Sequence, residues 1–600
     1  MDDQNKNLIF ATVLSFIVIT GWMIMFPPAE PPLPADTAAQ TSQDTATAAA
    51  PAASTPAAAA PADIAAQQAE AGRVDIDTPE LAGSISLLGG RIDDLKLKEY
   101  HVELSKESDI VTLLRPAGEQ DAYYTLYGWT PGGTTALEDV PGPTTIWSVE
   151  NGSKLTPSTP VTLRWDSPTG LIFRRTLTID ENFMFSIKQA IENTSNATQR
   201  MAPYGVIARH GEPQDQKGFF ILHEGLIREV DGELEESDYS DIADLSYDER
   251  EASLADVQQV EENGWLGFTD HYWMTTLIPE PGQPFTSVVR YADKADIYQA
   301  QFRLRAQDVA PGATASATTH FFAGAKEWET IRAYEKNMGI DKFIDSIDWG
   351  WFFFLTKPIF AVLHWLNALI GNMGWAIIGL TIIIKAILFP LAYKSYVSMA
   401  KMKELQPEME KIKERAGDDR QKVQQEMMEL YKKEKVNPAS GCLPILLQIP
   451  IFFSLYKVIF VTLELRHAPW IGWIKDLSAP DPSSILNLFG LLPYATPSPD
   501  SLLAIISLGV LPIILGISMW LQQKLNPAPT DPTQAMIFAW MPWVFMFMLG
   551  TFASGLVIYW IANNTITFIQ QYTIMRSHGH KPDVLGNVLK SFKKRPKDAK

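Results

Sequence analysis

Long apolar runs dominate the second half of the chain. Five of them follow residue 370, each with at most one charged residue, and they are 371–393, 441–463, 502–521, 536–552 and 556–575. A helix that crosses a bilayer needs about 20 apolar residues, so each run predicts a transmembrane helix. Only three residues separate the last two runs, which predicts a tight helical hairpin.

A sixth apolar run lies near the N-terminus. Leu8–Phe26 carries no charge over 19 residues, whereas the core of a signal peptide is only about 7–15 residues long. Residues 1–26 therefore predict an uncleaved transmembrane anchor, with cleavage in the Ala-rich stretch that follows as the alternative. The sequence thus predicts a polytopic α-helical membrane protein with six transmembrane helices.

The lysines and arginines of the connectors indicate the orientation, because cytosolic connectors of membrane proteins carry an excess of these residues. Connectors 394–440, 522–535 and 576–600 contain 11, 1 and 8 of them, whereas 464–501 contains 2. We therefore predict that both termini lie in the cytosol. Residues 27–370 and the loop 464–501 then lie on the outer side.

The outer segment combines two kinds of sequence. Residues 27–71 contain 8 Pro and 19 Ala but no aromatic residue, and such a composition predicts an extended, flexible linker. In residues 72–340 apolar and polar positions alternate, as in Val161 and Leu163 around Thr162. Short alternating runs bounded by Gly, Pro, Asn and Asp predict a large antiparallel β-sandwich.

Two features of this predicted sandwich have a functional alternative. Residues 228–264 are strongly acidic and predict a solvated loop or short helices. A Ca²⁺ site is the alternative there, although the carboxylates lack the spacing of a calcium loop. Trp129, Trp147 and Trp265 could stack on a sugar, but packing in the core is the favoured interpretation.

Residues 341–370 join the sandwich to the apolar half. The stretch is rich in aromatic residues from Trp349 onward and is interrupted by Lys357, Pro358 and His364. Aromatic side chains collect at the membrane interface, so we predict an amphipathic helix on the outer surface. The alternative is a seventh span, which would place the basic connectors outside.

The charged connector 394–440 predicts a helical hairpin on the cytosolic side. Apolar positions recur at three- and four-residue steps on both sides of Gly417, which predicts two short antiparallel helices. Their methionines include Met402, Met409, Met427 and Met428. The favoured interpretation is that this methionine stripe forms the seam of the hairpin. The functional interpretation is a receptor for apolar segments, because methionine is a soft, adaptable contact.

Lys385 lies inside a predicted span, where an ammonium group costs about 2.5–3.5 kcal/mol on insertion scales. Snorkelling to the inner surface is the simplest interpretation. Thr381, however, lies one turn earlier on the same face, and the other predicted spans add Gln448, Gln522, Gln523, Asn563 and Asn564. This many polar groups predict a shared hydrated face, in which Lys385 would attract a carboxylate from elsewhere.

Charge and composition exclude several functions. The net charge of −19 argues against a DNA-binding protein, and residues 27–356 alone contribute −27. The tail 576–600 is basic, which predicts contact with ribosomal RNA or anionic lipid, or a simple anchoring role. The single cysteine, Cys442, excludes an internal disulfide and a cysteine-cluster metal site. Without a phosphate-binding loop or a zinc motif, we expect no cofactor, no metal and no enzyme activity.

Several motifs between Phe352 and Gln571 resemble a known family. They are Met399–Met402, Leu405–Pro407, Gly417–Asp419, Gln425–Met428, Lys435–Pro438, Gly441–Cys442, Leu447–Phe452, Glu464–Arg466, Asp476–Ser478 and Ser554–Val557. In these residues the chain closely resembles the YidC family of bacterial membrane-protein insertases, which are related to the mitochondrial and chloroplast insertases. The anchor, the linker and the outer β-domain are similar in layout to the Gram-negative form.

This resemblance implies a five-helix insertase core with a hydrophilic groove that opens to the cytosol and to lipid. The positive charge of the groove, usually Arg in the family, falls on Lys385 here. Tyr559 and Trp560 match an aromatic pair of the last span. The predicted substrate groove consists of Lys385, Thr381, Gln448, Gln522, Gln523, Tyr559, Trp560 and Asn563.

The resemblance also implies a function and partners. The protein would insert and fold nascent proteins of the bacterial inner membrane, alone or with the Sec translocon, and residues 27–370 would be periplasmic. Its expected partners are nascent membrane proteins, the Sec translocon, the ribosome and signal recognition particle pathway, and membrane lipids, but not DNA.

On the residues alone, two other classes of function stay open. A solute transporter that uses Lys385 as an anion site predicts internal repeats with broken helices, and we find no such repeat. A sugar-active or sugar-binding envelope enzyme would need a carboxylate or histidine cluster on the β-domain. Five further spans are too many for a mere anchor of such an enzyme.

Overall fold

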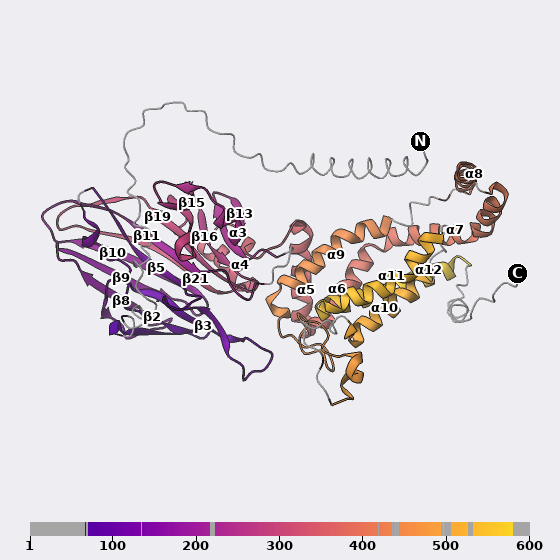
Figure 1. Cartoon of the computed structure of the whole chain (residues 1–600), viewed down its shortest axis with the longest axis horizontal. Coiled ribbons are helices and arrows are strands. Elements are labelled where there is room, and N and C mark those ends of the chain that lie inside the picture. The colour runs from indigo at the N-terminus through magenta and orange to yellow at the C-terminus, as the bar shows by residue number, and fades with distance from the viewer. Residues whose placement is uncertain are drawn as a thin grey trace, which may run out of the picture. The chain divides into compact units, whose positions relative to one another are not determined.

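The structure, a computed structural model, describes residues 70–133, 135–216, 222–417, 419–434, 443–493, 506–525 and 532–579, with single positions at 67, 436 and 496. The predicted anchor 1–26, nearly all of the linker 27–71 and most of the tail 576–600 lie outside the described residues. Within the described part, the chain forms a β-domain followed by a group of helices (Figure 1).

The β-domain contains a twelve-stranded and a nine-stranded sheet. The strands of the larger sheet are β1 (Arg73–Asp77), β2 (Leu81–Ser86), β3 (Arg91–His101), β4 (Ile110–Leu114), β5 (Tyr123–Gly132), β7 (Lys154–Leu155), β11 (Gln199–His210), β14 (Tyr247–Asp248), β15 (Ser253–Val260), β18 (Phe285–Ala292), β19 (Ile297–Leu304) and β20 (Gln307–Val309). Those of the smaller sheet are β6 (Ser148–Asn151), β8 (Val161–Asp166), β9 (Leu171–Ile179), β10 (Met184–Asn193), β12 (Gly225–Val230), β13 (Glu233–Asp238), β16 (Gly264–Thr269), β17 (Trp273–Pro279) and β21 (Thr314–Ala325).

The order of the strands shows how the chain crosses between the sheets. The larger sheet runs β14-β15-β18-β19-β11-β5-β3-β2-β1-β7, with β20 on β11 and β4 on β3, and the smaller runs β13-β12-β16-β17-β21-β10-β9-β8-β6. All pairs between these strands are antiparallel, as predicted, except that β1 pairs with β7 in parallel. Tyr123 of one sheet packs against Phe268 of the other, so the two sheets enclose a common core.

The predicted alternation holds where one face of a strand is solvated. Val161 and Leu163 are fully buried while Thr162 between them is only partly covered. Trp129, Trp147 and Trp265 are likewise buried, which agrees with the core interpretation. Arg175 is also buried, where it donates to the carbonyl of Gly90 at 2.6 Å and lies over the ring of Trp147.

The prediction for the acidic residues 228–264 was wrong. Apart from the short helix α3 (Tyr239–Ala243), these residues mainly form strands, namely the second half of β12 and all of β13, β14 and β15. Strands form because pairing with β16 and β18 satisfies their backbone groups, and because Arg228 neutralises Glu235 and Asp256. In the described part of the chain, no three His, Cys, Asp or Glu side chains come together in a way that could hold a metal ion.

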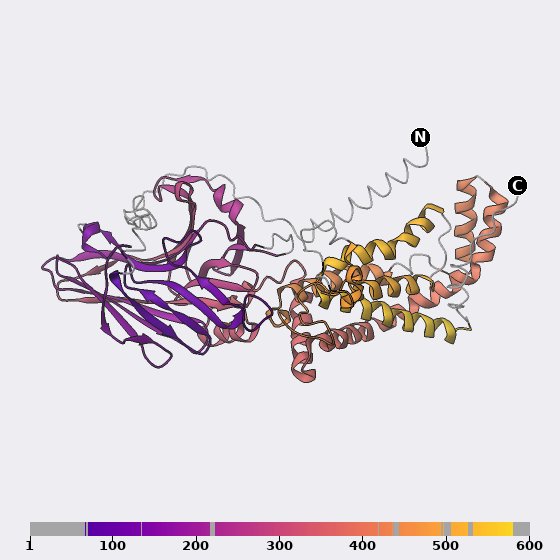
Figure 2. The same ribbon diagram turned by 60° about the horizontal axis from the view of Figure 1, so that its bottom comes forward.

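The second half consists of helices. They are α4 (Trp328–Met338), α5 (Phe353–Ile370), α6 (Met373–Ile387), α7 (Phe389–Ala416), α8 (Arg420–Lys433), α9 (Leu443–Val461), α10 (Val510–Gln523), α11 (Pro532–Met548) and α12 (Ser554–Ser577). Helix α12 is central, because it contacts α6, α7, α9 and α10. Helix α5 runs across the direction of α9 and α12 (Figures 1 and 2).

The predicted straight span 371–393 is broken in the structure. Helix α6 ends at Ile387, α7 begins at Phe389, and the two helices are bent by 68°. The cause is Pro390, which has no N–H to donate to the carbonyl of Ala386 and whose ring crowds that carbonyl. Lys385 therefore lies in the last turn of α6, beside the bend, and not in the middle of a continuous helix.

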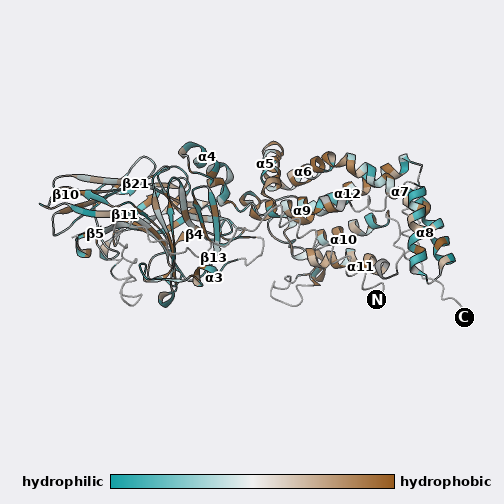
Figure 3. Ribbon diagram, turned by 90° about the horizontal axis from the view of Figure 1, so that it is seen from above, coloured by the Kyte–Doolittle hydropathy of each residue, from teal (hydrophilic) through white to brown (hydrophobic). Residues whose placement is uncertain are grey.

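Other predicted boundaries also differ. The first helix of the predicted hairpin 394–440 is not short, since α7 begins inside the predicted span and runs for 28 residues. Helix α10 begins at Val510, eight residues after the predicted start of its run. Apolar residues concentrate on α5, α6 and α9–α12, whereas α8 and the adjoining end of α7 are largely hydrophilic (Figure 3).

Among the described helices, α5 is the one that is long and apolar enough to cross a membrane by itself. The bent pair α6–α7 meets the same criterion if it is counted as one broken span. The apolar segments Gln448–Val461, Val510–Gln523 and Met536–Thr551 are shorter. Six spans, and the surface position of 341–370, therefore stay predictions.

A buried carboxyl group makes the stability of the β-domain depend on pH. Glu229 is 1% exposed, and burial raises its pKa from 4.5 to about 7. Since the unfolded chain releases this proton at lower pH than the folded chain, the free energy of unfolding falls as the pH rises from about 4.5 to about 7 and then levels off.

We expect Glu229→Gln to abolish most of this fall and to stabilise the β-domain at pH 8 by on the order of 2 kcal/mol. Glu233→Gln, at an exposed carboxylate of the neighbouring strand, is the matched control and should change little. Thermal unfolding of the full-length protein in detergent at pH 5 and pH 8 measures both. Equal behaviour of the two variants at pH 8 would contradict the assignment.

Candidate functional site

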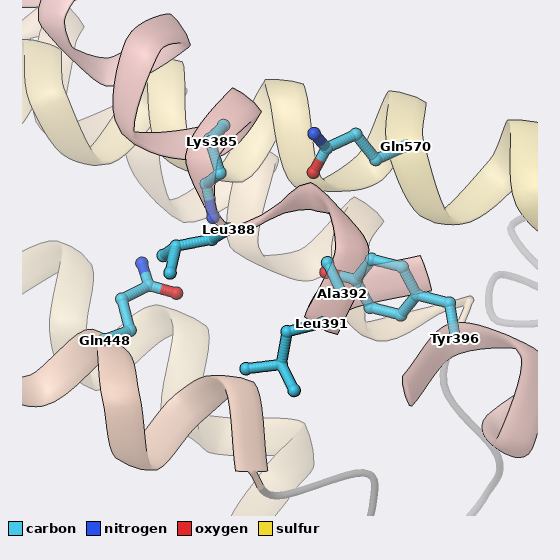
Figure 4. Close-up of a pocket in the computed structure, with 7 residues that line it drawn as sticks. All are labelled: Lys385, Leu388, Leu391, Ala392, Tyr396, Gln448 and Gln570. Atoms are coloured by element: carbon cyan, nitrogen blue, oxygen red, sulfur yellow. The ribbon is translucent and has the colours of Figure 1, made fainter. Parts of the chain in front are cut away.

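Lys385 lies on the wall of a small cavity within the helical part (Figure 4). The cavity is lined by Lys385, Leu388, Leu391, Ala392, Tyr396, Gln448 and Gln570. Its volume of about 30 Å³ is enough for roughly two water molecules. The side chain of Lys385 points toward the part of the cavity where Gln448 lies (Figure 4).

The ammonium group of Lys385 makes no hydrogen bond or ion pair with any residue that the structure describes. Its side chain is nevertheless half-buried. The bend at Leu388 brings the start of α7 to the same cavity, so apolar and polar groups of α7, α9 and α12 surround the charge. An ammonium group in this position is stabilised by water or by an anion from outside the described chain.

Lys457 shows what a compensated lysine looks like in the same helical part. It lies in α9, its side chain is 7% exposed, and its ammonium group donates to Asp348 just before α5. The carboxylate of Asp348 also accepts from the backbone N–H of His223 at 2.9 Å. Of the two lysines, Lys457 is therefore engaged within the protein, whereas Lys385 keeps its charge available.

A chain of amide side chains starts from the cavity. Gln448 Nε2 of α9 donates to Asn563 Oδ1 of α12 at 2.6 Å. On the next residue of α12, Asn564 Nδ2 donates to Ser518 Oγ of α10 at 3.1 Å. The two asparagines are buried and lie within 3.4 Å of each other (Nδ2 to Oδ1), so a polar path joins α9, α12 and α10 across an otherwise apolar interior.

Three other predicted groove residues, Thr381, Tyr559 and Trp560, have different surroundings. Thr381 is buried on α6 and donates to the carbonyl of Ile377 at 2.8 Å. Tyr559 is buried within reach of the Gln448 amide. Trp560 packs on Phe452 with ring centroids 5.0 Å apart, and its indole N–H has no hydrogen-bond partner among the described residues.

The two consecutive glutamines of α10 do not join this group. Gln523 donates to the backbone carbonyl of Phe538 in α11, so its amide holds two helices together. Gln522 is half-buried, and neither it nor Gln523 lines the cavity of Lys385.

Sequence reasoning missed Gln570, Tyr396 and Ser518. Gln570 follows Asn563 by seven residues, which is two helical turns, and Thr567 lies between them at four residues. This polar stripe on α12 could have been found from the spacing alone. Tyr396 could not, because it reaches the cavity only through the bend between α6 and α7.

The four methionines of the hairpin have different environments. Met409 is buried with Ile412 and Leu430, and Met427 packs against this cluster, so these two form the seam between α7 and α8. Met428 is 48% exposed, and Met402 is half-buried outside the seam cluster. The seam interpretation thus applies to Met409 and Met427, whereas Met428 presents an apolar surface.

The structure combines a large β-sheet domain with an apolar helical part that holds a half-buried charge. Comparison with known proteins gives the family. A family model described as "60Kd inner membrane protein" matches residues 365–581, and one described as "YidC periplasmic domain" matches residues 73–362. The chain belongs to the YidC family of membrane protein insertases.

Relatives over the full length agree with this assignment. The chain is 66% identical to the membrane protein insertase YidC of Dinoroseobacter shibae over 99% of both chains, and 62% identical to that of Jannaschia sp. over 100% of both. A crystal structure of an active YidC insertase is 18% identical and covers 83% of this chain and 92% of that chain, with a TM-score of 0.35. The assignment rests on the sequence matches. It makes this chain an inner-membrane protein with a periplasmic domain.

The hydrogen bonds of the polar path can be tested by the stability of the protein, without an insertion assay. Asn563→Leu removes the acceptor of Gln448 Nε2, and a buried donor that loses its acceptor costs about 1–3 kcal/mol. We expect a lower thermal unfolding midpoint of the full-length protein in detergent. Adding Gln448→Leu should restore part of the loss, because both partners are then apolar.

Thr565→Val is the matched control on α12, since Thr565 is exposed and donates only to the carbonyl of Ile561. If Asn563→Leu unfolds at the same temperature as Thr565→Val, the path does not contribute to the packing of the helices.

Proposed function

We propose that this insertase moves polar segments of its substrates through a groove built around Lys385 and the amide path of Gln448, Asn563 and Asn564. The observation that supports the proposal best is the half-buried ammonium group of Lys385, which has no partner among the described residues and faces a cavity. A carboxylate of an acidic substrate segment that enters the cavity would form the ion pair that Lys385 lacks among the described residues.

The groove lowers the cost of carrying a polar segment across. Removing a polar group from water without a replacement hydrogen bond costs about 2–7 kcal/mol. In our proposal, Lys385 and the amide path replace part of this hydration, together with the water that the cavity can hold. Tyr559 and Trp560 form the aromatic side of the groove, where the apolar part of the substrate passes toward lipid.

The cytosolic hairpin receives the substrate first in this proposal. Two features support it. The hairpin presents Met428 and Met402 outside its own seam, and α7 connects the hairpin directly to the cavity, because it is one helix from Phe389 to Ala416. Met409 and Met427 serve instead to hold the two helices together.

We place the chain in the inner membrane with both termini in the cytosol and residues 27–370 in the periplasm. The basic connectors support this orientation. The direction of α5 across α9 and α12 supports its position on the outer surface (Figures 1 and 2), as do the exposed rings of Trp351, Phe353 and Phe354 at its start.

Transfer of the apolar part of the substrate from water into lipid would drive insertion. On acidic flanks the membrane potential would add about 2.3 kcal/mol per charge per 100 mV.

The substrates in this proposal are nascent inner-membrane proteins. We extend it to the Sec translocon, to the ribosome and signal recognition particle pathway, and to membrane lipids as partners. The basic residues of the connector 394–440 and of the tail 576–600 support contacts with ribosomal RNA or with anionic lipid on the cytosolic side.

The charge at position 385 is the testable core of this function. We expect Lys385→Arg to keep activity, and Lys385→Ala and Lys385→Glu to reduce insertion of substrates with acidic flanks by about tenfold or more, because the lost attraction is worth at least about 1.4 kcal/mol. An in vivo insertion assay with substrates that differ only in flank charge measures this effect.

Lys394→Ala is the control, since Lys394 is an exposed lysine on α7, nine residues further along the chain. Substrates with neutral flanks should depend less on position 385 than acidic ones. Full activity of Lys385→Ala on every acidic substrate would refute the assigned role.

A further inference from the structure

A second, larger cavity lies where the β-domain meets the outer end of the helical part. Its volume is about 550 Å³. The β-domain contributes Val102, His271 and Tyr272, and the helical part contributes residues near the ends of α9, α11 and the loop that follows α9. The cavity is separate from the one at Lys385, and insertion as proposed above makes no use of it.

One wall of this cavity carries a cation with donors to spare. Arg466 Nη2 donates to the carbonyls of His101 and Val102, the latter at 3.2 Å. The guanidinium also lies 5.5 Å from the ring centre of Trp273, so its position is fixed from two sides. Its Nε and Nη1 groups make no hydrogen bond to any described residue, and no carboxylate in the described chain forms an ion pair with it.

The carboxylate on the same cavity is already engaged. Asp476 Oδ1 accepts from the backbone N–H of His467 at 3.2 Å and of Ser478 at 2.8 Å, and from Ser478 Oγ at 2.6 Å. These bonds spread its charge over the loop. Asp476 Oδ2 lies 4.0 Å from His467 Nε2. The guanidinium of Arg466 is the cation of this lining that still has donors to offer, and a guanidinium fork matches the geometry of a phosphate group.

Part of the wall is aromatic and comes from α9 and from the residues just before α12. Tyr456 and Phe460 of α9 and Phe552 before α12 line the cavity together with the loop. An anionic ligand alone would not need these rings, whereas a phosphate that carries acyl chains would bury its chains against them.

Exposed apolar and tryptophan side chains surround the cavity, as is typical of a protein surface at the level of lipid headgroups. Val102 and Leu104 lie in the turn between β3 and β4 and are 56% and 50% exposed. Trp375 and Trp473 are half-exposed at the same end of the helices, and tryptophan rings collect at the level of lipid headgroups. A free phosphate ion would account for none of these exposed apolar groups.

We propose that this cavity binds an anionic phospholipid of the outer leaflet, with its phosphodiester on Arg466 and its acyl chains against Tyr456, Phe460 and Phe552. The inference rests on the proposed function only for the orientation, which places the loop 464–501 on the periplasmic side. A bound lipid would fill the junction between the β-domain and the helices. It would thereby hold the turn between β3 and β4 at the membrane surface.

The test uses the full-length protein in vesicles of phosphatidylcholine and photoreactive phosphatidylglycerol in a nine-to-one mixture, without substrate. After illumination, labelled peptides are mapped by mass spectrometry. We expect the label on peptides from residues 100–110 or 456–480. Arg466→Gln should lower the amount of label about tenfold, because it removes the charge-assisted hydrogen bonds to the phosphodiester. Lys475→Gln, at an exposed lysine of the same loop, is the control and should keep the label.

A second variant separates lipid binding from misfolding. Ala553→Phe places a ring in the cavity and narrows it while Arg466 keeps its bonds to the β-domain, and it should also reduce the label. Lys385→Ala should keep it, so that failure of the lipid site and failure of the insertion groove give different results. Label that survives in Arg466→Gln, or that inorganic phosphate displaces at millimolar concentration, would overturn the proposal, the latter in favour of a free-anion site.

Discussion

A half-buried charge that has no partner among the described residues is the constraint on which the helical part depends. The ammonium group of Lys385 costs about 2.5–3.5 kcal/mol in hydrocarbon, so its surroundings must supply water or polar groups. The cavity that Lys385 lines can hold water, and Gln448, which begins the amide path to Ser518, lies on its wall. The bend after Ile387, caused by Pro390, brings the start of α7 to the same cavity.

Lys457, which lies in the same helical part, differs from Lys385 because it has an ion-pair partner. Its ammonium group is neutralised by Asp348, which also accepts from the backbone of His223 in the β-domain. One lysine therefore ties the β-domain to α9, and the other is left for an external anion. A similar contrast appears in the loop that follows α9, where Asp476 accepts hydrogen bonds from its own loop and Arg466 keeps donors without a hydrogen-bond partner among the described residues.

The sequence predicted the features that follow from periodicity and composition. Alternation predicted the two sheets, and the apolar runs predicted the positions of five helices and the polar groups on them. It did not predict the break at Leu388, because that depends on how one proline acts inside an apolar run. The acidic segment 228–264 was mistaken for a loop, since the arginine that neutralises its strands acts through tertiary contacts. For Gln523, a predicted groove residue, the sequence did not show that its side-chain amide donates to the backbone carbonyl of Phe538 in α11.

The central claim is that the cavity beside Lys385 receives the polar part of a substrate during insertion. A photoreactive amino acid at Leu391 tests it most directly, because Leu391 lines this cavity and its replacement leaves Lys385 in place. With a nascent chain stalled during insertion, we predict a crosslink to its acidic flank, and none from Ile382, which is exposed on α6. A stalled chain that crosslinks to Ile382 but not to position 391 would contradict the account.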